Sequence, residues 1–262
     1  MNGIITLTTD FGLSDPFVGV MKGQILARFR EAQMIDLTHG IVAHWPAEAG
    51  FWLARSYKYF PRGTLHVAVV DPGVGTQRDI VSVEADGHMF LAPDNGLLAP
   101  LTSRVAHPRI HKVDLNRLTP FGIGPPSATF HGRDIFAPLA AEIAAGRCRP
   151  ANVGEEASEL VPAWVDEPEE ASDHVAGVVI TIDHFGNLIT NIDAALIKRF
   201  HAPLVRTGAH EFALGRTYGD RQPGEYLALI NAFDVVEIAR AEQSAAEGLG
   251  VGRGAPVVVT ER

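Results

Sequence analysis

The first 150 residues alternate strand-like and helix-like segments, and this alternation constrains the fold more than any other feature of the sequence. Runs rich in branched apolar side chains are typical of buried strands, and they occur at residues 4–9, 34–37, 64–70, 80–84 and 88–92. Apolar residues spaced by four from Phe17 to Phe29 predict a helix after the first strand, and Pro46 begins a second that extends through Tyr59. Alternation of this kind predicts an α/β fold in which helices cover a mainly parallel sheet.

An acidic segment interrupts this pattern. Residues 155–174 (EEASELVPAWVDEPEEASDH) hold eight acidic residues and no Lys or Arg, whereas the rest of the chain is nearly neutral, with 22 basic against 23 acidic residues. This Pro- and Glu-rich composition is typical of an exposed linker. We therefore expect an N-terminal α/β domain at residues 1–154, a linker at 155–174 and a C-terminal β domain at 175–262.

The sequence beyond the linker changes to short strands. They are predicted at residues 175–182, 188–190, 225–230, 235–239 and 256–260, and only residues 193–200 have a helical pattern. Short strands without intervening helices favour a smaller antiparallel sheet, closed like a barrel.

Composition excludes several classes of protein. With 46% hydrophobic and 20% charged residues, the chain is ordinary for a globular protein, so disorder and coiled coil are excluded. Its net charge of −9 argues against a nucleic-acid partner. Neither a signal peptide nor an apolar run of about 20 residues is present, which argues against a membrane partner. The single cysteine, Cys148, suits a reducing compartment, so we expect a cytoplasmic protein.

Two aspartates directly follow predicted strands. Asp10 and Asp71 come at strand ends, where open α/β sheets bind their ligands. The alternative is that each Asp only caps its own turn. Arg78 lies seven residues after Asp71, so the glycine-rich loop between them can fold back and pair the two side chains. The loop lacks the Gly-Lys-Ser/Thr ending of a phosphate-binding P-loop.

A histidine precedes a predicted helix at the same edge of the sheet. His131 lies in the sequence FHGRD, where Asp134 can cap a helix that runs to about Ala145. Histidine titrates near neutrality, which suits acid–base chemistry, although a single histidine is often structural. A metal site is the rival interpretation, with ligands drawn from Asp36, His39, His44 and His131. No zinc-binding spacing such as His-Glu-x-x-His is present.

In the second half, the sequence DHFGN at residues 183–187 follows a predicted strand. It is either a plain hairpin turn or a binding loop, in which Asp183 binds a cation and Asn187 reads the edge of a base. The residues alone therefore indicate a small-molecule site between two domains.

Together, four motifs resemble the S-adenosylmethionine hydroxide adenosyltransferase family, which is related to fluorinases and chlorinases. They are TDFG at 9–12, DPGVGT at 71–76, FHGRD at 130–134 and DHFGN at 183–187. The resemblance implies an α/β domain followed by a β-barrel domain, and a homotrimer whose sites lie between subunits. It also implies hydrolysis of S-adenosyl-L-methionine to adenosine and L-methionine without a metal or cofactor.

The resemblance assigns roles to individual residues. The implied catalytic residues are Asp71, Arg78 and His131. Implied substrate contacts are Asp10 at the ribose hydroxyls, Asp183 at the methionine ammonium, Asn187 at adenine, and Trp45, Phe185, Tyr218, Asn231 and Phe233 along the pocket. One position departs from the family: Ala232 stands where a serine usually helps to hold the methionine carboxylate.

The implied chemistry is in-line attack of water on the ribose C5′, with methionine leaving as a neutral thioether. We expect His131 to act as general base, with Arg78 and Asp71. Halogenating relatives carry Tyr in place of Asp71 and lack His131, so hydrolysis is favoured. Two alternatives stay open at this point: a non-catalytic nucleoside-binding protein on the same scaffold, and a metal-dependent hydrolase.

Overall fold

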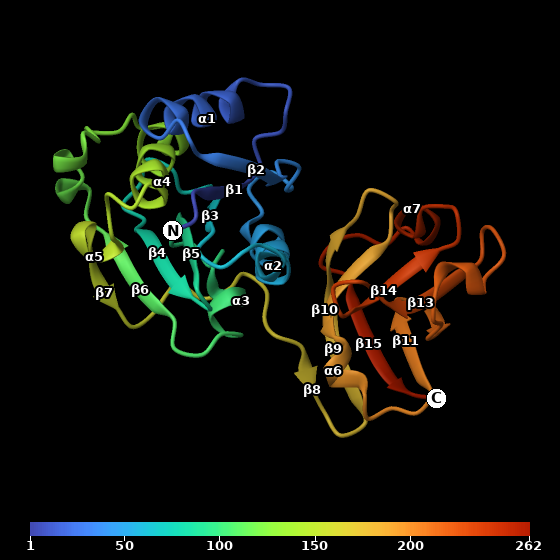
Figure 1. The fold of residues 1–262 in the computed structure, drawn as a ribbon. Coiled ribbons are helices and arrows are strands. Elements are labelled where there is room, and N and C mark those ends of the chain that lie inside the picture. The colour runs from blue at the N-terminus through green and yellow to red at the C-terminus, as the bar shows by residue number, and fades with distance from the viewer. The chain divides into compact units, whose positions relative to one another are not determined.

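A computed structural model describes all 262 residues and divides them into two compact units, Met1–Trp164 and Val165–Arg262 (Figure 1). The first is an α/β unit and the second an antiparallel, barrel-like unit, so the predicted fold class is confirmed. None of the helices combines the length and apolar character needed to cross a membrane.

The sheet of the first unit has the strand order β2-β1-β3-β5-β4-β6-β7. Its strands are β1 (Ile4–Thr9), β2 (Gln33–Thr38), β3 (Leu65–Val69), β4 (Ile80–Ala85), β5 (His88–Pro93), β6 (Arg109–Val113) and β7 (Gly154–Ala157). Strands β2, β1, β3 and β5 are parallel, whereas β4, β6 and β7 add antiparallel pairs at one edge. The reversal between β4 and β5 occurs at Asp86 and Gly87, whose positive φ angles of 48° and 77° suit a tight hairpin turn.

Helices cover both faces of this sheet. The helical elements are α1 (Phe17–Arg28), α2 (Pro46–Ser56), η1 (Tyr57–Tyr59), α3 (Ala99–Thr102), η2 (Leu115–Arg117), η3 (Thr119–Phe121), η4 (Gly132–Phe136), α4 (Ala137–Ala144) and α5 (Pro150–Val153). Met21 and Ile25 of α1 share one buried core with Leu139 of α4. Leu53 of α2 belongs to a second core with Val81 of β4. The sheet is therefore buried on both faces, as its apolar strands require.

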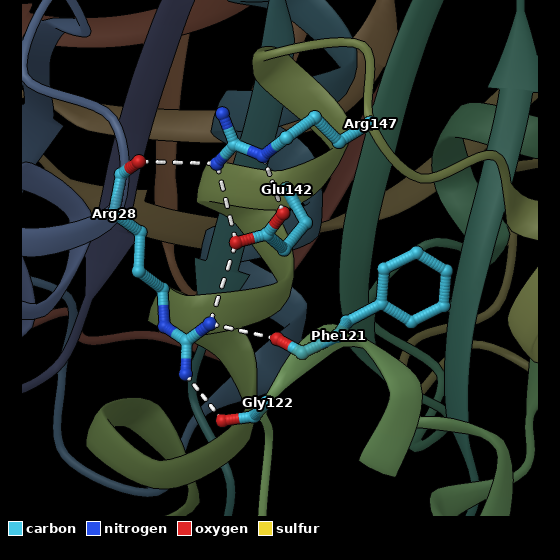
Figure 2. A network of polar contacts seen from close by, with 5 residues as sticks. All are labelled: Arg28, Phe121, Gly122, Glu142 and Arg147. Carbon is cyan, nitrogen blue, oxygen red and sulfur yellow. Dashed lines mark hydrogen bonds and ion pairs between the residues drawn. The ribbon is translucent and has the colours of Figure 1, made fainter.

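A buried carboxylate links α1 to α4 (Figure 2). Glu142 accepts hydrogen bonds from Arg147 Nε at 2.7 Å and Arg28 Nη1 at 3.3 Å. The Arg147 hydrogen bond, followed by the Arg28 interaction, holds the pKa of Glu142 below its usual value despite burial. Arg28 also donates to the carbonyl oxygens of Phe121 (2.9 Å) and Gly122 (2.6 Å). Two arginines thus neutralise one buried acid, and Arg28 also fixes the chain at Phe121 and Gly122.

A histidine is fully buried within the sheet. His66 Nδ1 lies 2.8 Å from Thr6 Oγ1, and its Nε2 lies 3.2 Å from His88 Nδ1. Burial, helped by the nearby His88, lowers the pKa of His66 to about 3. His66 is therefore a neutral core side chain at physiological pH.

Much of the segment at residues 155–174, expected to be an exposed linker, forms backbone hydrogen bonds with one unit or the other. Residues 154–157 form β7, paired with β6. Farther along, Val161 N donates to Asp94 Oδ1 at 2.9 Å, and β8 (Glu169–Glu170) pairs with β9 (His174–Ile182) of the second unit. The Glu155, Glu156, Glu169 and Glu170 side chains remain exposed. An acidic composition therefore coexists with paired backbone, because backbone amides bond regardless of side-chain charge.

The second unit is a nearly closed antiparallel sheet in the order β12-β11-β15-β9-β10-β14-β13. Its strands are β9 (His174–Ile182), β10 (Leu188–Asp193), β11 (Pro203–Thr207), β12 (His210–Ala213), β13 (Tyr226–Ile230), β14 (Val235–Arg240) and β15 (Pro256–Glu261), with helices α6 (Ala194–Ile197), η5 (Tyr218–Asp220) and α7 (Ala245–Leu249). A bridge between Leu214 and Ala228 joins the β12 end to β13.

In the first unit the sequence missed strands β6 and β7, and in the second it missed β8, β11, β12 and α7. The helix predicted at residues 193–200 forms only at Ala194–Ile197. The missed elements have at most five residues each, and segments this short show too little apolar alternation to be predicted, so they are defined by their neighbours in the sheets.

Candidate active site

A cavity of about 310 Å³ opens in the first unit, where β1 and β3 end. Residues lining it include Asp10, Asp71 and His131, three of the residues predicted from the sequence. The strand-end rule explains this meeting: parallel strands deliver the residues that follow them to one edge of the sheet.

Asp71 and Arg78 form a double hydrogen-bonded ion pair. Arg78 Nε lies 3.0 and 2.9 Å from the two carboxylate oxygens of Asp71, and Arg78 Nη2 donates to Oδ2. The side chain of Arg78 is only 10% exposed and that of Asp71 only 5%. The loop between them folds back as its spacing predicts, and Gly75 is required there: its φ is +78°, and a Cβ would lie 2.1 Å from the Ala128 carbonyl oxygen.

Arg78 also contacts His131. Its Nη2 lies 2.9 Å from His131 Nδ1. A guanidinium only donates, so Nδ1 accepts and the neutral ring carries its proton on Nε2. Burial, then the Arg78 charge, lower the pKa of His131, against the opposing charges of Asp71 and Asp134. The lone pair that a general base needs is therefore already hydrogen-bonded to a cation.

The helix after His131 begins differently from the prediction. The π turn η4 starts at Gly132, so Asp134 lies inside the first turn, and its predicted role as a helix cap is wrong. Its Oδ2 instead accepts from Ser127 N at 2.9 Å and Ser127 Oγ at 2.5 Å. The hydrogen bond from Arg133, together with those from Ser127, holds the pKa of Asp134 well below its usual value. Asp134 thus fixes the loop that precedes His131.

Asp10 is held by the segment that follows β2. Its Oδ2 accepts from His44 N at 2.9 Å. His39 Nδ1 lies 2.8 Å from Thr9 Oγ1, and His39 Nε2 lies 3.0 Å from Asp36 Oδ1. No group of three or more His, Cys, Asp or Glu side chains in the chain is arranged as a metal site. His39 and Asp36, considered as metal ligands, instead contact each other and the end of β1.

Three phenylalanines form an apolar wall that the sequence analysis missed. The rings of Phe11, Phe17 and Phe130 meet edge to face, with centroids 5.2 to 6.0 Å apart, and all three line the cavity. Phe11 and Phe130 belong to the motifs that contain Asp10 and His131, so their proximity to these polar residues was an available signal. Phe17 was assigned to the buried face of α1, yet it is half-exposed.

Trp45 does not line this cavity. Its ring packs edge to face on Trp164, with centroids 5.8 Å apart.

The remaining predicted site residues belong to the second unit. Asp183 Oδ1 accepts from Phe185 N and Asn187 N, and Oδ2 accepts from Asn187 Nδ2, all at 2.9 Å. This is the hairpin turn considered as an alternative, and Gly186 supplies its positive φ of 84°. The turn leaves Phe185 75% exposed. The hydrogen bonds that close the turn do not prevent an exposed side chain such as Phe185 from contacting a ligand.

Near Asp183, the second unit buries a carboxyl group that the sequence analysis missed. Glu237 is 2% exposed and accepts a hydrogen bond from Tyr218 Oη at 2.7 Å. Burial raises the pKa of Glu237 against its hydrogen bonds with Tyr218 and Asn231, and the Asp183 charge raises it further. Asn231 Oδ1 accepts from Phe233 N at 2.9 Å. The available signal was a lone acid in the apolar run VVEIA.

Comparisons with known proteins cover nearly the whole chain. The model of the SAM hydroxide adenosyltransferase N-terminal domain matches residues 5–154, and that of the C-terminal domain matches 177–258. An (R)-S-adenosyl-L-methionine hydrolase from Thermus thermophilus is 34% identical, over 95% of this chain and 96% of its own length. One from Salinispora tropica is 35% identical, over 98% and 97%.

The chain is also similar to a fluorinase and to a protein of known structure. A fluorinase from Actinopolyspora mzabensis is 25% identical, over 98% of this chain and 97% of its own length. The crystal structure of an uncharacterized conserved protein from Thermotoga maritima superimposes with a TM-score of 0.88 at 33% identity, covering 98% of this chain and all of the other.

Proposed function

The chain belongs to the SAM hydroxide adenosyltransferase family, and we propose that it hydrolyses S-adenosyl-L-methionine to adenosine and L-methionine. The observation that carries this proposal is the contiguous set Asp71–Arg78–His131, with Asp71 and His131 on the wall of the cavity beside Asp10. A protein that only binds nucleosides has no need of this buried charged set.

The reaction is a displacement at the ribose C5′. A bond forms between the water oxygen and C5′ while the C5′–sulfur bond breaks, and its electron pair goes to sulfur. Methionine therefore leaves as a neutral thioether and needs no general acid. One proton must leave the attacking water. Holding water and sulfonium in line supplies part of the rate enhancement, and the phenylalanine wall keeps the site apolar.

We assign the proton to Asp71 rather than to His131. Both residues line the cavity and both are hydrogen-bonded to Arg78, but a carboxylate keeps further lone pairs, whereas the one lone pair of the neutral His131 ring, on Nδ1, is already engaged. A water oxygen that is bonding to carbon becomes strongly acidic, so even a weak base can accept its proton. In this assignment His131 holds Arg78, and Arg78 holds the Asp71 carboxylate in place.

The same carboxylate favours water over halide. A halide ion beside Asp71 meets like-charge repulsion in a poorly solvated site, whereas water can donate a hydrogen bond to the carboxylate. We therefore propose hydrolysis, despite the similarity to a fluorinase.

We further propose a homotrimer in which the second unit of one subunit completes the site of its neighbour. This is supported by the division of the candidate residues between the two units, and by exposed apolar side chains near both groups. Leu13 is 77% exposed and Phe185 75% exposed. Exposed apolar surface of this kind is typical of an interface.

The proposed reaction uses no metal or cofactor, and we place it in the cytoplasm. The lone Cys148 suits that location, and burial raises the pKa of its thiol to about 11, which keeps it unreactive.

Turnover in oxygen-18 water, with and without a chelator, tests the function. We expect adenosine that carries the label at its 5′ oxygen, at the same rate in both samples. Label in methionine, or no turnover, contradicts the proposal. Activity that a chelator abolishes and a divalent ion restores indicates a metal-dependent hydrolase instead.

Mixing two variants, one damaged in each unit, tests the shared site. At substrate concentrations well below KM we expect almost no activity from Asp71→Asn and about a tenth of the wild-type activity from Asp183→Asn. Random reassembly of an equal mixture should make about a quarter of the sites wild type if neighbours share them, so the mixture should exceed the average of the two separate variants. Light scattering should report three chains per particle. A monomer, or no excess over that average after unfolding and refolding the mixture, contradicts the shared site.

A further inference from the structure

A short turn after β5 holds both ends of the loop at residues 71–78, which we call the catalytic loop because it carries Asp71 and Arg78 of the proposed site. Asn95 Nδ2 donates to the Val70 carbonyl at 2.9 Å, and Asp94 N donates to the Asp79 carbonyl at 2.9 Å. Val70 directly precedes Asp71, and Asp79 directly follows Arg78. The position of residues 94 and 95 therefore fixes the loop that carries both charged partners of the proposed site.

The segment that leads to the second unit holds the same turn from the other side. Val161 N donates to Asp94 Oδ1 at 2.9 Å, and Trp164 Nε1 donates to the Asn95 carbonyl at 2.6 Å. At Gly96, a Cβ would lie 2.3 Å from the Pro162 carbonyl oxygen, so the chain passes too closely there for any side chain. The segment at residues 158–164 is thus held on the turn, through its residues 161–164, by two hydrogen bonds between a side chain and the backbone and by close packing.

The joint between the two units lies directly beside this anchor. Trp164 is the last residue of the first unit and Val165 the first of the second. Any displacement of the segment at Trp164 reaches Asn95 through one hydrogen bond and Val70 through one more. The path from the joint to Asp71 is therefore two hydrogen bonds and one peptide link long.

We propose that Asn95 and Trp164 are positioning residues, which couple the seating of residues 158–164 to the geometry of the catalytic loop. The kinetic part of this inference rests on the proposed function. A displacement of about 1 Å at a reacting group can cost about 100-fold in rate, so a shift of the loop matters even when the fold is intact.

Two variants break the coupling with little change in shape. Asn95→Asp keeps Oδ1, which accepts from Leu97 N at 3.3 Å, but presents an acceptor instead of a donor to the Val70 carbonyl. Trp164→Phe keeps an aromatic ring against Trp45 and removes the indole N–H donor together with the second ring, a loss of volume that its control variant shares.

Two matched controls carry the same chemical changes elsewhere. Asn191 of β10 has the same contact pattern, because it accepts from Val178 N at 2.8 Å and donates to the Asp166 carbonyl at 3.1 Å, within the second unit. Asn191→Asp is therefore the control for Asn95→Asp. Trp52 of α2 packs on Phe51, and Trp52→Phe is the control for Trp164→Phe.

The first readout is independent of activity. Val74 N and Thr76 N are hydrogen-bonded within the loop, to Asp71 and Gly73. We expect their amide hydrogen exchange to accelerate at least about tenfold in Asn95→Asp, less in Trp164→Phe and not in the controls. Unchanged exchange at these amides in Asn95→Asp, or equal acceleration in Asn191→Asp, overturns the inference whether or not the wild type turns over substrate.

The second readout is kinetic. We expect kcat to fall about 10- to 100-fold in Asn95→Asp, with KM within about twofold of the wild type. The ratio of its kcat to that of the wild type at the same pH should rise as the pH falls, because a protonated carboxyl group can again donate to Val70. A fall confined to KM, or a kcat deficit that does not depend on pH, overturns the positioning role. A wild type without turnover instead removes the proposed function and leaves the exchange result standing.

Discussion

Among the aspartates that follow strands, Asp71 in the first unit and Asp183 in the second are held in opposite ways. Asp71 takes its hydrogen bonds from the side chain of Arg78, which in turn reaches His131, 53 residues farther along the chain. Asp183 takes its bonds from groups within four residues, in its own turn. One carboxylate is positioned by tertiary structure and the other by local sequence.

This difference predicts how each region responds to change. The edge of the sheet that carries the proposed catalytic residues depends on contacts among β3, the loop after it and η4, so changes at any of these should alter the proposed reaction. The Asp183 turn should survive most distant changes, and substitutions there should act on binding. The predictions below test this contrast, beginning with the largest effect.

Asp71→Asn should abolish most of the activity. It removes both the charge that pairs with Arg78 and the proposed proton acceptor, so we expect kcat to fall by about 10³-fold or more, with KM little changed. Steady-state kinetics with a circular-dichroism control for folding measures this. Activity within tenfold of the wild type contradicts the central role of this carboxylate.

Substitutions of His131 separate its two possible roles. An amide oxygen in His131→Asn can accept from Arg78 but cannot take up a proton, whereas His131→Ala does neither. We expect about a 100-fold loss of kcat in His131→Ala and a loss of less than about tenfold in His131→Asn. Equal, large losses in both variants restore the general-base role predicted from the sequence.

The stability of the first unit should fall in acid. The pKa of His66 is about 3 in the folded state and ordinary, near 6.5, in the unfolded state. The unfolded state therefore binds the proton first, and stability falls as the pH drops below 6.5, by about 2 kcal/mol at pH 5. The pKa of His88 is also lowered by burial, and so acts in the same direction.

Urea unfolding between pH 7.5 and 5 measures this dependence, with a separate fluorescence or exchange probe in each unit. His66→Gln should flatten the dependence in the first unit, even where it lowers stability overall. If the slope of the variant equals that of the wild type, the buried histidine is not its source.

Asp183→Asn should give the smallest effect. The amide oxygen can keep the two backbone hydrogen bonds of the turn, and the substitution removes the charge together with the acceptor of Asn187 Nδ2, so folding should change little. If the carboxylate meets the substrate's ammonium group, KM should rise about tenfold, with kcat within about threefold. A change confined to kcat places Asp183 with the proposed catalytic residues and removes the contrast between the two regions.

The sequence predicted most strands of the sheets because their patterns are local. β1 and β9 are rich in β-branched residues, and β3 is apolar except for His66, so their sequences favour buried strands. The short strands β11 and β12 gave no usable pattern. Asp134 was assigned as a helix cap because the π turn that includes it has no distinctive local signature.

In the candidate site, too, the features with a local sequence pattern were predicted and those without one were missed. The pairing of Asp71 with Arg78 followed from a seven-residue loop, and the choice of His131 from its motif. The phenylalanine wall and Glu237 were missed because each depends on which side chains meet in space. The linker was identified by its charge, but its contacts with Asp94 and Asn95 involve backbone groups that composition does not report.

By itself, the sequence determined the α/β and β units, the loops that carry Asp71, His131 and Asp183, and the family. These depend on spacings of a few residues, over which backbone geometry is fixed. Only the tertiary structure decided that the lone pair of His131 faces Arg78, and that the joint between the units is anchored to the catalytic loop. Hydrogen bonds are directional and short, so their partners are known only when residues distant in sequence have been brought within about 3 Å.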